Sequence, residues 1–93
     1  MTAAEKLVLL KKDLQMMTSS NDDYLENLLA MAEKAMAREG IQMDGGIECD
    51  MTQVQYAAYL FRKRGAADTA MPRYLRYQLN NILFGQKGKS NDV

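Results

Sequence analysis

The side chains that most often perform catalysis or bind metal are scarce in this 93-residue chain. It has no histidine, which removes the commonest general base and the commonest metal ligand. Cys49 is the single cysteine, so the chain can form no internal disulfide and no zinc ribbon. A histidine-activated serine or cysteine nucleophile is therefore excluded, and no glycine-rich phosphate loop is present. We expect no enzymatic activity, no cofactor and no resident metal.

Three carboxylates gather in a glycine-rich segment near the middle of the chain. Asp44, Glu48 and Asp50 could together bind calcium, but their spacing does not match that of an EF-hand loop. We favour solvated loop carboxylates, with Asp50 capping the helix that follows it. We also favour a buried or incidental Cys49 over a reactive one, because no pattern of nearby bases supports activation.

The order of the charges is more informative than their sum. Twelve basic and twelve acidic residues cancel, but the first fifty residues hold five bases and ten acids, and the rest hold seven bases and two acids. The basic half could contact nucleic-acid phosphates. It could instead contact the acidic half of a second copy, head to tail, as in a closed ring. A third alternative is that the two halves pair within one monomer.

Apolar residues recur at helical spacing, which predicts an all-α fold, a small bundle of four helices. The apolar run at residues 7–10 could also be a short buried strand, but flanking lysines and a Thr2/Glu5 capping box favour a helix. Gly40 and Gly65 end the second and third helices, and Pro72 begins the fourth. The expected helices cover about residues 3–17, 22–39, 51–64 and 72–84.

The long loop at residues 40–50 contains Asp44-Gly45, which is typical of a hairpin turn, so we expect a loop or a short hairpin there. Residues 1–85 form one helical domain, and residues 86–93 are expected to be a disordered polar tail. The longest apolar run is far shorter than the roughly 20 residues that span a bilayer. The charge order at the start is the reverse of a signal peptide, which predicts an intracellular protein without membrane contact.

The fourth predicted helix carries more aromatic surface than one inward stripe can bury. Tyr74, Tyr77 and Phe84 accompany Asn80 and Asn81, which are mediocre helix formers. Such a helix is either sandwiched or placed at an interface. The chain also has eight methionines, and we favour core packing over an adaptable interface for them, with three on predicted core stripes: Met17, Met36 and Met51.

Two segments of the chain resemble a known family. The run MPRYLRYQLNNILF at residues 71–84 resembles the C-terminal segment of small phage and prophage head–tail connector proteins, also called adaptor or head-completion proteins. The run YAAYLFRKR at residues 56–64 is similar to the preceding helix of that family. The order of the earlier segments also fits, so the resemblance covers about residues 5–84.

The resemblance implies a small all-α structural subunit that assembles with itself into a ring of about twelve copies. Such a ring docks on the portal protein after DNA packaging, extends the DNA channel and provides the platform for tail-completion proteins. The implied location is the head–tail junction of the virion, after assembly in the cytoplasm of the bacterial host. Passing DNA would be contacted only without sequence preference.

Within such a ring, one set of residues is predicted to bind the neighbouring subunit. Arg73, Arg76, Tyr77 and Asn80 would contact an acidic surface formed by a second set: Asp22, Asp23 and Glu26. A third set would face the channel and its DNA: Arg62, Lys63 and Arg64.

Two other function classes remain open at this stage. The runner-up is a small helical nucleic-acid-binding regulator that uses the basic region at residues 62–76. The other alternative is a monomeric antitoxin-like or scaffold partner protein.

Overall fold

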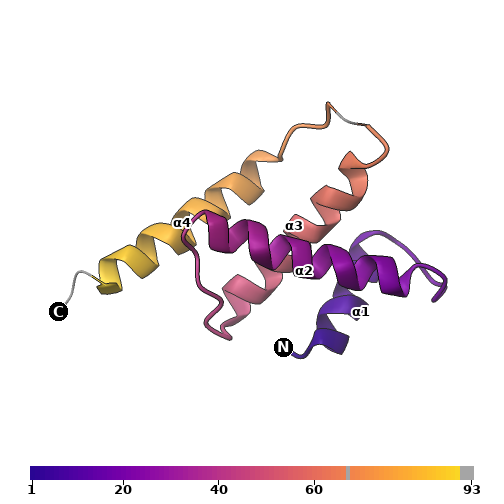
Figure 1. Ribbon diagram of the computed structural model, residues 1–93, viewed down its shortest axis with the longest axis horizontal. Helices are drawn as coiled ribbons and strands as arrows, with labels where there is room; N and C mark the ends of the chain where they lie inside the picture. Colours follow the sequence, from indigo (N-terminus) through magenta and orange to yellow (C-terminus); the bar gives the residue numbers. More distant parts are fainter. Residues whose placement is uncertain (67, 91–93) are drawn as a thin grey trace.

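The computed structural model describes residues 1–66 and 68–90 of the chain. This part contains four helices and no strand, which confirms the predicted all-α fold. Figure 1 shows α2 and α3 crossing near the centre, with α1 towards one end of the long axis and α4 towards the other. None of the described helices is long and apolar enough to cross a bilayer. The helices are α1 (Ala3–Asp13), α2 (Asp22–Arg38), α3 (Ile47–Lys63) and α4 (Arg73–Ser90).

Two apolar clusters hold these helices together. The first lies among α1, α2 and α3, and the second joins the end of α2, the following loop, α3 and α4. Tyr56 and Leu60 of α3 pack against both clusters, so α3 is the shared element. The buried members of the first cluster are Leu10, Leu25, Leu28, Leu29, Ala32, Val54, Ala57 and Ala58. Those of the second are Met36, Ile41, Cys49, Tyr59, Leu75, Leu79 and Ile82.

α1 begins as predicted but ends early. Thr2 and Glu5 form the capping box, with Oγ1 of Thr2 accepting from the Glu5 N–H at 3.1 Å and Glu5 accepting from the Thr2 N–H at 2.8 Å. At the other end Gln15 adopts a left-handed backbone, with φ of 58°. The Met16 N–H then donates to the Lys11 carbonyl at 2.8 Å, which closes a Schellman turn.

This turn corrects the prediction for Met17. The expected helix over residues 3–17 would have placed Met17 on the core stripe, but its side chain is 96% exposed. Core packing is confirmed for Met36, which is fully buried, and in part for Met51, which is half-buried. The sequence did not indicate an end of α1 here because glycine, the usual residue at the left-handed position, is replaced by Gln15.

Gly40 ends α2 as predicted. Its φ is 97°, and the N–H groups of Gly40 and Ile41 donate to the carbonyls of Ala37 and Met36, both at 3.0 Å. Ile41 and Met36 are both buried in the second cluster, which supplies the apolar contact that accompanies a Schellman turn.

Of the two alternatives for residues 40–50, the structure has the loop and not the hairpin, and this loop is shorter than predicted because α3 begins at Ile47 rather than at Met51. The Asp44 carboxylate accepts from the Gly46 N–H at 2.8 Å, so its turn leads into a helix. Carboxylates in the first turn of α3 suit the positive end of the helix dipole. Asp50 is consequently inside α3, and the prediction that it caps the helix is wrong.

α4 continues through Gly85 to Ser90, so the prediction of a disordered tail from residue 86 is wrong for residues 86–90. The Gln86 side-chain amide accepts from the Gln42 N–H at 2.9 Å and donates to the Gln42 carbonyl at 2.6 Å. This pairing fixes the helix beyond Gly85 against the loop that follows α2. Residues 91–93 of the predicted tail lie outside the described residues.

Candidate assembly surface

One face of α4 packs on the second cluster, and the opposite face exposes large apolar side chains to solvent. Leu75, Leu79 and Ile82 form the buried face. On the other side Tyr74, Tyr77 and Phe84 are 49%, 63% and 65% exposed. Together with the exposed Asn81 they follow alternating three- and four-residue spacing, which is typical of a helix seam that packs on another helix. We call these four residues the α4 stripe.

The structure separates the predicted basic contact residues of α4. Arg73 and Tyr77 are exposed. Arg76 instead makes a two-pronged ion pair with Glu39, with Nη1–Oε1 at 2.7 Å and Nη2–Oε2 at 3.1 Å. Its Nη1 also lies 3.5 Å from Oδ1 of the half-buried Asn80. The hydrogen bonds to Glu39 raise the pKa of the Arg76 guanidinium, which stays charged.

The predicted acidic partners at the start of α2 are also divided. Oδ1 of Asp22 lies 2.9 Å from Nζ of Lys11, so this carboxylate is paired within the chain. Asp23 and Glu26 are both exposed on the first turns of α2. These two carboxylates are the part of the predicted acidic surface that faces solvent.

The three cations predicted to face a channel lie on the surface of the chain itself. Arg62 pairs with the Asp13 carboxylate at 3.4 Å. Lys63 lies 5.7 Å from the ring centre of Tyr59, and Arg64 lies 4.1 Å from that of Phe61. All three remain exposed at the end of α3, so the ion pair of Arg62 and the cation–π contacts of Lys63 and Arg64 position these cations without removing them from water.

Ion pairs therefore join the acidic and basic halves within one chain. Arg62 with Asp13, and Arg76 with Glu39, each link the two halves. This is the intramolecular alternative left open by the sequence, and it accounts for part of the charge order. Arg73 and the exposed acids at the start of α2 are outside these pairs.

The three carboxylates of the glycine-rich segment do not converge. Asp50 is buried and binds the Met1 amine at 2.8 Å and Lys6 at 3.4 Å. The hydrogen bond from this amine lowers the pKa of the Asp50 carboxyl against the opposing effect of burial. The described part of the chain contains no group of His, Cys, Asp or Glu side chains that could hold a metal.

Cys49 is buried in the second cluster, as predicted. Its sulfur lies 3.8 Å from the Gln42 carbonyl oxygen, and burial raises the pKa of the thiol. A thiol that resists ionisation is a poor nucleophile.

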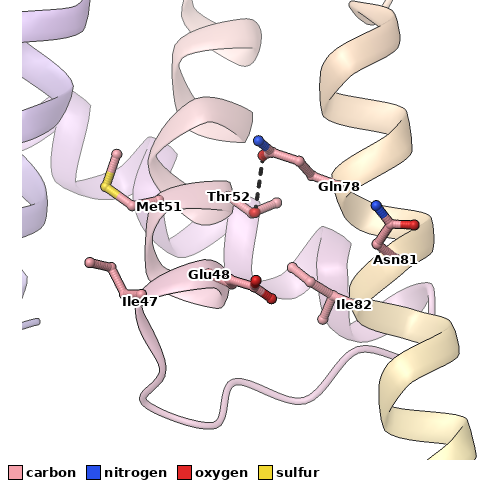
Figure 2. A pocket seen from close by; sticks show the side chains of 7 residues that line it. All are labelled: Ile47, Glu48, Met51, Thr52, Gln78, Asn81 and Ile82. Carbon is pink, nitrogen blue, oxygen red and sulfur yellow. Dashed lines mark hydrogen bonds between the residues drawn. The ribbon is translucent and has the colours of Figure 1, made fainter.

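A groove that the sequence did not reveal lies between the start of α3 and α4 (Figure 2). It encloses about 260 Å³, and Thr52 donates across it to Gln78 at 3.2 Å. Among the described residues that line it, Glu48 alone carries a charge. The lining comprises Ile47, Glu48, Met51, Thr52, Gln78, Asn81 and Ile82. The sequence did not indicate this groove, because Ile47 and Glu48 were expected in the loop or hairpin and not on α3.

No protein-family model, no curated protein and no solved structure matches this chain.

Proposed function

We propose that this chain is a non-enzymatic structural subunit that assembles with copies of itself as a phage head–tail connector. In this role a ring of subunits docks on the portal after DNA packaging, extends the channel and provides the platform for the tail. The main observation in favour of self-assembly is the α4 stripe. Its exposed aromatic rings are spaced for packing on another helix, and they do not contribute to the core of this 93-residue chain.

The charge of α4 favours a contact with a different surface of the next copy. α4 contains four cations and no acid, so two α4 helices side by side would bring only like charges together. The start of α2 offers Asp23 and Glu26 in exposed positions. A contact between α4 of one copy and α2 of the next is heterologous, and repetition of such a contact gives a ring when the rotation closes.

Arg73, Tyr77 and the rest of the α4 stripe are the residues of α4 that we assign to this contact. Arg76 forms an ion pair with Glu39 of the same chain, and we therefore assign it to positioning α4 rather than to binding a neighbour. The assignment as a phage connector is supported, in addition, by the resemblance of residues 71–84 to that family. This segment contains the α4 stripe.

The assembly contact can be tested by charge reversal and rescue. Sedimentation velocity across a concentration series should show self-association of the wild type and its loss in Arg73→Glu. Combining Arg73→Glu with Asp23→Arg should restore it in part, because the opposite charges face each other again. Val8→Glu, at an exposed apolar position on α1, is the matched control and should assemble normally.

Two outcomes would contradict this proposal. A wild type that stays monomeric at every concentration would exclude self-assembly as stated. Binding of the monomer to DNA at about 50 mM salt, with a salt slope of several phosphate contacts, would favour the nucleic-acid regulator instead. That binding should then fall in Arg62→Glu and Lys63→Glu.

A further inference from the structure

The groove between α3 and α4 continues directly into the α4 stripe, because Asn81 belongs to both. Figure 2 shows Glu48 projecting from α3 into the space beside Ile82 and Asn81 of α4. Ile47 at the rim is 69% exposed, which is unusual for so large an aliphatic side chain. Any molecule that covers the α4 stripe therefore also lies beside this partly apolar, acidic groove.

A protruding apolar side chain lies towards the other end of the molecule. Met17 follows the Schellman turn at the end of α1, and its 96% exposure is the largest of any large hydrophobic residue described. The loop leads within five residues to the start of α2. Lys12, on the last turn of α1 beside this loop, is exposed. Figure 1 shows the α1–α2 loop and the far end of α4 at opposite ends of the long axis.

We propose that Met17 of one copy inserts into the α3–α4 groove of the next copy. This rests on the proposed function: when α4 docks on the start of α2, the loop that precedes α2 comes to lie beside the groove. An unbranched thioether adapts readily to an irregular apolar wall, here formed by Ile47, Met51 and Ile82.

The charges at the two sites support a second copy as the occupant. Glu48 is the charged residue of the groove, and Lys12 is exposed in the last turn of α1, five residues before Met17 in the sequence. A protruding apolar side chain that follows a basic helix end would thus meet an apolar groove that contains a carboxylate. A contact of a protrusion with a groove elsewhere on the same molecule is heterologous, as head-to-tail assembly requires.

Two variants that each disable one side test this contact. Met17→Glu removes the protrusion, and Ile47→Glu damages the groove, and both positions are exposed enough to leave the fold intact. Each variant alone should associate at least about tenfold more weakly than the wild type in sedimentation velocity. An equal mixture should form a dimer and stop there, because each partner retains one complementary surface. Met31→Glu, at another exposed methionine, is the control.

Charge reversal of Glu48 and Lys12, and NMR of a labelled variant, show whether the contact lies at the groove. Glu48→Lys should weaken association, and combination with Lys12→Glu should restore it. In a sample of ¹⁵N-labelled Met17→Glu, addition of unlabelled Ile47→Glu should shift the side-chain amide signals of Gln78 and Asn81.

Each remaining outcome decides the proposal. If both single variants assemble like the wild type while Arg73→Glu does not, the Met17 contact is wrong and the α4–α2 contact stands. If Ile47→Glu is impaired and Met17→Glu is not, another part of the second copy occupies the groove, and the proposal fails. If the wild type does not self-associate, both this contact and the proposed assembly fail.

Discussion

The two apolar clusters of the chain differ in how completely they are enclosed. The first is surrounded by three helices, α1, α2 and α3, and consists of leucine, alanine and valine. The second is covered on one side by α4 alone, whose outer face is aromatic and exposed. The comparison indicates that α1 to α3 establish the fold, whereas α4 completes a smaller core and presents a surface.

Polar contacts strengthen this contrast. Besides its buried leucines and Ile82, α4 is attached by the Arg76–Glu39 ion pair, by the Thr52–Gln78 hydrogen bond and by the Gln86 amide bound to the backbone of Gln42. The ion pair is partly exposed, and exposed pairs contribute little to stability. We therefore expect α4 to open before the three-helix part does.

Equivalent leucine truncations in the two clusters give the largest expected effects. Leu25 and Leu79 are both fully buried, so replacing either with alanine should cost about 2–5 kcal/mol. Leu25→Ala should lower the protection of all four helices, because it opens the enclosed cluster. Leu79→Ala should speed hydrogen exchange first in α4 and the loop after α2, with α1 and α2 still protected.

Urea unfolding together with amide hydrogen exchange measures both quantities. Met31→Ala serves as the surface control, with an expected change of less than about 0.5 kcal/mol. If α1 and α2 lose protection together with α4 in Leu79→Ala, the two clusters form one cooperative unit and the contrast is wrong.

The features predicted correctly are those encoded by local signals. The Thr2/Glu5 capping box and the Gly40 helix end each depend on residues within one turn of the chain. The start of α3 was missed because Asp44-Gly45 satisfies its turn locally. The second cluster, in which Cys49 is buried, also includes residues of α4 that are more than 25 positions away. Local turn chemistry is shared by hairpins and helix starts, so it did not distinguish them.

Part of the candidate surface on α4 was also predictable, because the spacing of aromatic residues along a helix is a local signal. The excess of aromatic residues on the last helix follows from spacing, and the exposed α4 stripe confirms that not all of it is buried. The pairing of Arg76 with Glu39 spans 37 residues and needs the tertiary fold. Spacing alone could have grouped Asn81 and Phe84 with Tyr74 and Tyr77, since the four residues alternate at three and four.

The buried carboxylate of Asp50 gives an intermediate effect in the three-helix part. Asp50→Asn removes a charge that binds the Met1 amine and Lys6, and we expect a loss of about 1–3 kcal/mol near neutral pH. The hydrogen bond from the amine lowers the pKa of this carboxyl below its ordinary value in the folded chain. The stabilisation by the Asp50 charge is therefore fully present above the unfolded pKa and is lost as the pH falls through the lower, folded pKa.

Urea unfolding at neutral pH and at successively lower pH should show the difference between wild type and Asp50→Asn shrinking in acid. Glu33→Gln, at an exposed position in the middle of α2, is the control and should change stability little. A difference that is constant with pH would show that Asp50 stabilises the fold by shape rather than by charge.

The two Schellman turns provide the smallest and most direct comparison of the regions. Gln15 adopts φ of 58° without being glycine, so Gln15→Gly should stabilise the chain by about 0.5 kcal/mol through relief of backbone strain. Gly40→Ala should destabilise it by about 1 kcal/mol, because φ is 97° there and a new Cβ would lie 3.3 Å from Cδ1 of Leu83.

The location of these effects separates the regions more clearly than their size. The Gly40→Ala methyl group is directed at α4, so it should increase hydrogen exchange in α4 more than in α1. Gln15→Gly should leave exchange in α4 unchanged, because its turn lies within the three-helix part. Thermal unfolding gives the sign and size of each change, and equal effects of Gly40→Ala on α1 and α4 would contradict the independence of the two regions.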